Sequence, residues 1–430
     1  MKDGRPVSYL LINLTTLVPK ECVLLILRIV GTSTLIITAI LVSSHVNRTS
    51  RVSRFWPFAV MSFCIPAFQI YAQAAYAFPL SIALLLSTIA GLLILRNTKI
   101  HRVVGMVLLV AALATYQMSA LFLLNLFLVT LIGENKVSVG IRRFAKNLCL
   151  LFCGIVIYFL VVFVLQNVTR LDYKARFSTV TLMDLPEKTL WFITRPFTLS
   201  FMPLTLRSPS VLEVILFGGT AFLLVSQFLR NLGEDLARRD KAFIFVAYFA
   251  SQIVSLSPLF ISRDNQIEPR MLIVNNWMNS FLLLSQSYLW LRRWLFKLNI
   301  SWLKNAISVN PLITFVIATI LIINSNYRFV EYIYKPYNRK VEFLEKAIES
   351  CAIRVKITII KRESSWPTRD LLGVWSQKTD LSSDWVPVPA VAVQMSRNSL
   401  KGIELREAYE TDVNAFSKNC IVYLQDYREG

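Results

Sequence analysis

Hydrophobic residues occur in long runs over the first three quarters of the chain, and polar residues gather between those runs. Backbone groups within lipid must be hydrogen-bonded inside their own segment, so runs of this length predict membrane helices. The predicted helical runs are residues 22–43, 56–70, 78–95, 103–133, 148–166, 211–229, 243–261, 271–290 and 309–323.

The run 103–133 is too long for one crossing. It carries no charge and would be about 46 Å long as a helix, whereas a bilayer core is roughly 30 Å thick. We therefore predict two short helices that meet at Tyr116 and Gln117, near one membrane face. A matching break is expected where Pro79 follows Phe78. Either both breaks line one polar cavity, or Tyr116 is an interfacial anchor and Gln117 a helix-turn residue.

The pattern changes after residue 323, where the chain becomes charged and mixed. Apolar residues first recur at helical spacing and then alternate with polar ones, at Val341, Leu344, Ile348, Ile353, Val355, Ile357 and Ile359. The predicted fold is therefore an all-α polytopic membrane domain over residues 1–324, followed by a small soluble α/β domain over residues 325–430.

Composition supports this class. Of the 430 residues, 55% are hydrophobic and 17% are charged, and the mean hydropathy is +0.54. Those values are too apolar for a soluble domain and fit a helical membrane protein.

The net charge of +20 would allow a nucleic-acid partner, but the positions of the cations argue against one. If the runs cross the membrane alternately, five short basic loops fall on the same side, which the positive-inside rule makes the cytoplasm. Their basic residues are Arg48, Arg51, Arg54, Arg96, Lys99, Arg102, Lys136, Arg142, Arg143, Lys146, Arg230, Arg238, Arg239, Lys241, Arg292, Arg293, Lys297 and Lys304. Residues 1–21, 167–210 and 263–270 and the C-terminal domain then lie outside.

The start of the chain does not fit this topology easily. Residues 1–21 begin outside, yet they contain no signal peptide that would carry them across. We expect that a first membrane helix is missing from this chain, and the alternative is that residues 7–18 insert unusually.

Motifs of soluble enzymes and metal sites were not found in the sequence, so no cofactor is predicted, and a role for a divalent metal is left open. Among the six cysteines, Cys351 and Cys420 fall in the outer domain, where they either pair or remain separate thiols.

The outer side offers carboxylates, which act as general bases, and arginines, which hold phosphate in a fork of hydrogen bonds. Arg28 is the most informative because it interrupts an apolar run, where lipid exposure costs several kcal/mol. It either faces a polar cavity or extends its charged end to the head groups.

Five segments carry a resemblance to a known family: GRPVSYLLINL, YAFPLSIALLL, LATYQMSALFLLNLF, PRML and GVWSQ with DWVPVP. In this order they resemble the bacterial serotype-converting O-antigen glucosyltransferases, which are C-type membrane glycosyltransferases. The resemblance implies a C-type helical bundle in the inner membrane with its C-terminal domain in the periplasm. It also implies transfer of a hexose, glucose in that family, from a polyprenyl phosphate donor to a surface glycan.

The same resemblance suggests roles for particular residues. A carboxylate in the first outer loop would take the proton of the acceptor hydroxyl, and Asp3 is the carboxylate next to the GRP segment. Residues for binding the substrate and the lipid phosphate are Arg5, Arg28, Tyr116, Gln117, Asp264 and Arg270. The family has an acidic pair ahead of GRP, which this chain lacks, so the 430-residue chain alone is either active through Asp3 or an inactive shortened form.

Two other classes remain open. A flippase or polymerase for lipid-linked oligosaccharides would also be basic and polytopic, and the arginines of residues 167–210 partly fit a polymerase. A membrane scaffold for a surface-polymer complex is the third class. Expected partners are the lipid-linked donor, the glycan acceptor and membrane lipids, with a donor-synthesising enzyme and a flippase as further partners.

Overall fold

The computed structural model describes the following part of the chain: residues 6–7, 11, 20–68, 78–134, 136–169, 184–202, 212, 216, 218–232, 237–261, 269–297, 311–330, 356–361, 404–409 and 420–423. The chain divides into two compact units, Met1–Asn326 and Tyr327–Gly430.

The described part of the first unit is helical. Its elements are α2 (Lys20–Arg48), η2 (Ser53–Phe55), α3 (Trp56–Met61), α5 (Phe78–Leu95), α6 (Lys99–Thr115), α7 (Gln117–Ala120), α8 (Leu123–Gly133), α9 (Val137–Thr169), α10 (Leu185–Phe192), η4 (Ile193–Phe197), α12 (Gly219–Leu232), α13 (Arg238–Ile261), η6 (Pro269–Leu272), α14 (Ile273–Lys297) and α16 (Pro311–Phe329). The bounds of α5 are those predicted from the sequence.

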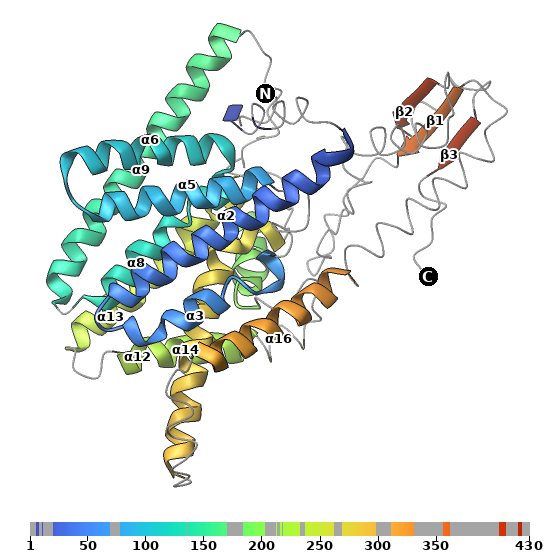
Figure 1. The fold of residues 1–430 in the computed structure, drawn as a ribbon. Coiled ribbons are helices and arrows are strands. Elements are labelled where there is room, and N and C mark those ends of the chain that lie inside the picture. The colour runs from blue at the N-terminus through green and yellow to red at the C-terminus, as the bar shows by residue number, and fades with distance from the viewer. Residues whose placement is uncertain are drawn as a thin grey trace. The chain divides into compact units, whose positions relative to one another are not determined.

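Helices α2, α5 and α6 lie side by side, and α9 packs against α6 and α8 (Figure 1). Gly105 lets α5 and α6 approach closely, because a Cβ atom there would lie only 3.0 Å from the carbonyl oxygen of Ala90 on α5. Small residues at helix crossings are typical of helices that pack within lipid.

Helix α8 lies at the centre of the bundle, where it contacts α2, α5, α9 and α13. All of its residues except Thr130 are buried, as expected for a helix that is apolar all round. Aromatic rings pack beside it: Trp277 of α14 stacks on Phe281 at 5.4 Å between centroids and meets Phe122 edge-on at 5.4 Å. The core is therefore built from α8 and the first turns of α14.

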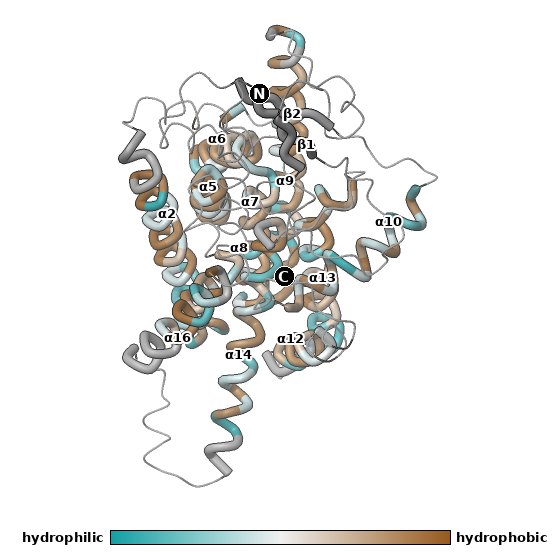
Figure 2. Tube along the Cα trace, turned by 90° about the vertical axis from the view of Figure 1, so that its right-hand side faces the viewer, coloured by the Kyte–Doolittle hydropathy of each residue, from teal (hydrophilic) through white to brown (hydrophobic). Residues whose placement is uncertain are grey.

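Within the described residues, four helices are long and apolar enough to cross a membrane: Ile26–Arg48, Phe78–Leu95, Val137–Leu165 and Arg238–Ile261, which belong to α2, α5, α9 and α13. Hydrophobic residues predominate along α5, α6 and α9 in Figure 2. Large apolar side chains are exposed on three of these helices, including Ile36 and Ile40 on α2, Phe159 and Phe163 on α9, and Val246 on α13. Exposed apolar surface of this kind supports a membrane protein.

The prediction of one helix over residues 56–70 was wrong. Helix α3 ends at Met61, and after it Phe63 N and Cys64 N donate to the third residue back, Val60 O and Met61 O, each at 2.9 Å. Pro66 explains the end of the helix, because it has no amide hydrogen and disfavours helical geometry in the residue before it.

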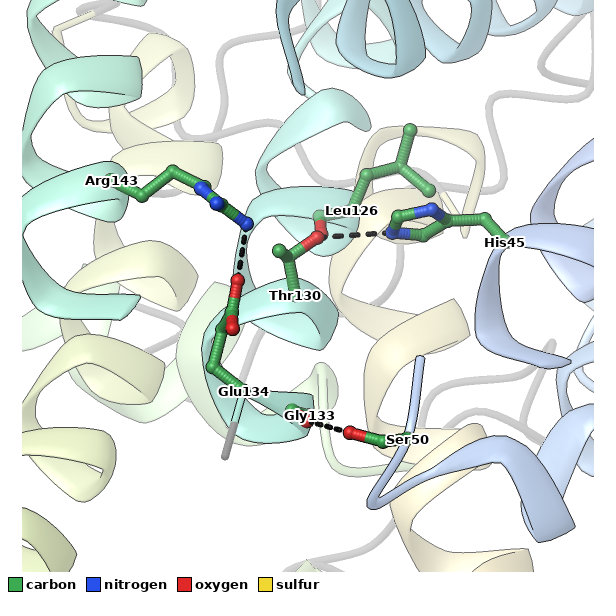
Figure 3. Close-up of polar contacts among 7 residues, drawn as sticks. All are labelled: His45, Ser50, Leu126, Thr130, Gly133, Glu134 and Arg143. Atoms are coloured by element: carbon green, nitrogen blue, oxygen red, sulfur yellow. Dashed lines mark hydrogen bonds and ion pairs between the residues drawn. The ribbon is translucent and has the colours of Figure 1, made fainter. Parts of the chain in front are cut away.

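The C-terminal end of α2, the end of α8 and the start of α9 meet at one junction (Figure 3). His45 Nε2 lies 3.0 Å from Thr130 Oγ1. The Ser50 hydroxyl donates to the carbonyl oxygen of Gly133 at 2.9 Å, and Arg143 pairs with Glu134. The first and third of the five basic loops predicted from the sequence are therefore neighbours in the fold.

In the second unit the structure describes three strands, β1 (Lys356–Lys361), β2 (Glu404–Tyr409) and β3 (Cys420–Tyr423). They form a parallel sheet in the order β2-β1-β3, with Ile357 opposite Leu405 and Cys420. The predicted helix near residue 344 lies outside the described residues, as does Cys351. The small soluble α/β domain and the pairing of Cys351 with Cys420 stay predictions.

Candidate functional site

The predicted break at Tyr116 is present. Helix α6 ends at Thr115, Tyr116 has an extended backbone with φ −159° and ψ 110°, and α7 begins at Gln117. Two backbone hydrogen bonds flank the break, from Tyr116 N to Ala112 O at 2.8 Å and from Ala120 N to Tyr116 O at 3.0 Å. The uncharged run is therefore two helices with a short helical turn between them, as its length predicted.

Ser87 of α5 satisfies the backbone groups at the next interruption, between α7 and α8. Its hydroxyl donates to the carbonyl oxygen of Ala120 at 2.5 Å and accepts from the amide of Leu123 at 3.0 Å. Helix ends leave unpaired carbonyl and amide groups, which are costly away from water. One buried serine on a neighbouring helix thus makes this break possible inside the bundle.

Tyr116 is buried with 3% of its surface exposed, so it is not an anchor that faces outward. The amide of Gln117 donates to the Tyr158 hydroxyl of α9 at 2.7 Å. The two residues of the break therefore lie within the bundle, between α6 and the helices packed against it.

The PRML segment lies against α7, the helical turn that follows the break at Tyr116. It forms η6, whose backbone contacts α7, and α14 follows directly from it. The Asn125 side chain of α8 donates to the carbonyl oxygen of Val274 at 2.8 Å and fixes the first turn of α14 to α8. Segments more than a hundred residues apart in the sequence are thus held together by a buried hydrogen bond.

Helix α14 also carries amide side chains that sequence reasoning missed. Asn275 lies against α13, where its amide donates to Gln252 Oε1 at 2.7 Å and its oxygen accepts from the Ser255 hydroxyl at 2.7 Å. All three residues are buried. The signal is the sequence NNWMNS near the start of an otherwise apolar run, whose length and composition predict only a membrane helix.

One turn further along α14, Asn279 makes a second set of hydrogen bonds. Its oxygen accepts from the Tyr248 hydroxyl of α13 at 2.5 Å, and its amide donates to the carbonyl oxygen of Ser200 at 2.6 Å. Asn275 and Asn279 are four residues apart and share a helix face. A continuous polar seam therefore joins α13 and α14 through the middle of the bundle.

Two buried cations lie on the segment that leads to Ser200. Lys188 of α10 is 3% exposed, with its Nζ 4.0 Å from the centre of the Trp191 ring, and Arg195 of η4 is 5% exposed. Element η4 is a π-helix that contains Pro196, and it packs against α13. Cations buried within a membrane protein and π-helical turns both occur often at functional sites.

The other predicted site residues are placed as follows. Arg28 is exposed on α2, whose neighbours include α3, α5 and α8. Asp3, Arg5 and Asp264 lie outside the described residues, and of Arg270 only the backbone is described. The proposed meeting of Arg5, Arg28 and Arg270 stays a prediction, although the backbone of η6 does lie at α7.

In the described part of the chain, no group of three or more His, Cys, Asp or Glu residues is placed to hold a metal ion. The site as described is therefore made of amides, hydroxyls and buried cations. Comparisons with family models, curated proteins and solved structures found no match to this chain.

Proposed function

We propose that this chain is a membrane glycosyltransferase. It would move a hexose, glucose by the resemblance, from a polyprenyl phosphate carrier to O-antigen or another surface glycan. The transfer would take place on the periplasmic face of a bacterial inner membrane.

One observation carries the proposal: three of the segments on which the resemblance rests meet in the fold. YAFPLSIALLL opens α5, LATYQMSALFLLNLF forms the end of α6, α7 and the start of α8, and PRML forms η6. Helix α7 contacts both α5 and η6. Ser87 of α5, the residue directly after YAFPLSIALLL, hydrogen-bonds to the interruption between α7 and α8, which lies within LATYQMSALFLLNLF. Segments that share one function are expected to lie together.

The proposed reaction follows from the assigned roles. Asp3 takes the proton of the acceptor hydroxyl while that oxygen bonds to the anomeric carbon of the sugar. The bond between this carbon and the phosphate oxygen breaks, and polyprenyl phosphate leaves with the electron pair. We assign binding of the phosphate and the sugar substrates to Arg5, Arg28, Tyr116, Gln117, Asp264 and Arg270.

The direct test is transfer of radiolabelled hexose from hexosyl polyprenyl phosphate to glycan in membranes that contain the full chain. We expect Arg270→Ala to lower the transfer rate about tenfold or more, because a charge-assisted hydrogen bond to phosphate contributes roughly 1.5–3 kcal/mol. Asp3→Asn should lower it as well if Asp3 is the base. Arg142→Ala is the matched control, since Arg142 is exposed near the start of α9, on the side predicted to be cytoplasmic.

Three outcomes would contradict the proposal. Wild-type membranes that transfer no sugar would exclude the activity for this chain. Movement of an intact lipid-linked glycan would favour a flippase, and growth of the glycan by whole repeat units would favour a polymerase. Normal transfer by Asp3→Asn would remove Asp3 from the mechanism while leaving the activity in place.

A further inference from the structure

Helix α14 has two neighbouring polar faces that differ in their hydrogen bonding. Asn275 and Asn279 form the first face, and their side chains bond to Gln252, Tyr248 and other groups of the bundle. The second face is rotated by about 100° and contains Asn276 and Ser280, which are also four residues apart.

The second face is buried without partners. Asn276 and Ser280 are each 3% exposed, and within the described residues neither Asn276 Oδ1 nor Ser280 Oγ has a hydrogen-bond partner. A buried polar atom without a partner costs about 1–3 kcal/mol. Two such atoms one helical turn apart, about 6 Å along the axis, are an expensive arrangement for a helix that only supports the fold.

We propose that Asn276 and Ser280 bind hydroxyl groups on the sugar of the lipid-linked donor. The choice of ligand rests on the proposed function. An amide oxygen accepts and a serine hydroxyl both donates and accepts, so this face matches the neutral hydroxyls of a sugar rather than a phosphate, which cations would hold. The face also lies on the first turns of α14, directly after the PRML segment.

Equilibrium binding to the purified full chain tests this assignment. The two probes are radiolabelled polyprenyl phosphate with glucose attached and the same lipid without glucose. We expect wild type to bind the glucosylated lipid more tightly than the lipid without glucose. In the double variant Asn276→Leu with Ser280→Ala, the ratio of the two affinities should fall about tenfold. Affinity for the lipid without glucose should not change. Ser287→Ala is the control, because Ser287 lies on the same helix and is exposed.

Thermal unfolding without lipid gives a second readout, because it separates a binding face from a structural one. Removing partnerless polar atoms should raise the melting temperature of the double variant, whereas Asn275→Leu should lower it by breaking satisfied hydrogen bonds. Two results would overturn the proposed sugar-binding role of Asn276 and Ser280: an unchanged preference for the glucosylated lipid, or a lower melting temperature in the double variant. Either would show that these residues support the fold or bind buried water. Sugar-dependent binding without any transfer would instead overturn the proposed reaction and keep the subsite.

Discussion

Ser87 closes an interruption in the middle of the bundle from a neighbouring helix. It bonds to the Ala120 carbonyl and to the Leu123 amide, which are the free groups at the end of α7 and the start of α8. Ser81 on the same helix is equally buried but donates only to Phe78 O within its own helix. The two serines look alike in the sequence and differ only in what the fold places opposite them.

We therefore predict that Ser87→Ala destabilises the protein by about 2 kcal/mol or more, since two buried backbone groups lose their partner. The melting temperature in detergent should fall by several degrees. Ser81→Ala should cost less than about 1 kcal/mol, because the Phe78 carbonyl stays within a helix. Equal effects of the two substitutions would show that Ser87 does not hold the break.

At the residue scale, sequence reasoning found charges more readily than amides. It singled out Arg28 because a cation in an apolar run is costly, but it passed over Asn275 and Asn279, whose amides cost little once their partners are in place. Those partners come from α13 and from Ser200, far away in the sequence. A single sequence does not show which distant groups an amide will meet in the fold. It therefore cannot distinguish an amide with hydrogen-bond partners, such as Asn275, from one whose oxygen has none, such as Asn276.

At the scale of elements, the length of an apolar run predicted where a helix is interrupted, whereas apolar composition alone did not. The run 103–133 exceeded one membrane thickness, and the break at Tyr116 was confirmed. The run 56–70 had a suitable composition, but it is not one helix, since α3 ends at Met61 before Pro66. Proline position would have corrected the second prediction, because its effect on the helix is local.

The junction of α2 and α8 depends on Gly133. A Cβ atom there would collide with Thr49 Cγ2 and lie 3.4 Å from Val52 Cγ2. The amide of Arg51 donates to the Gly133 carbonyl at 3.4 Å, and the hydroxyl of Ser50 donates to the same oxygen at 2.9 Å (Figure 3). The absence of a side chain at residue 133 thus permits the contact between two basic loops.

Gly133→Ala should therefore cost about 1–3 kcal/mol by overpacking this junction, measured as a fall in melting temperature. Gly219→Ala is the matched control: a Cβ there meets nothing within 4 Å, so the change should be neutral or slightly stabilising in a helix. Adding Thr49→Ser to Gly133→Ala removes the colliding methyl group and keeps the hydroxyl, and it should restore part of the loss. A double variant no more stable than Gly133→Ala would show that the collision is not the cause.

At the scale of the whole molecule, the sequence predicted a helical bundle with apolar runs, and in the part of the chain that the structure describes four helices are long and apolar enough to cross a membrane. The order and neighbours of the helices were not predictable, because they depend on contacts such as Asn125 to Val274 between distant segments. The sequence also predicts sidedness through its basic loops, and the structure brings two of those loops together at the end of α8.

Sidedness leads to a prediction about orientation. The positive-inside rule places the five basic loops in the cytoplasm and the C-terminal domain outside. Alkaline phosphatase needs disulfides that form in an oxidising compartment, so it reports periplasmic fusion sites. A fusion after Gly430 should be active, and one after Lys304 inactive, when both are expressed at equal levels by immunoblot. A fluorescent reporter that matures in the cytoplasm should give the opposite pattern at the same two positions. Activity after Lys304 together with inactivity after Gly430 would invert the topology, and it would move the proposed sugar transfer to the wrong side of the membrane.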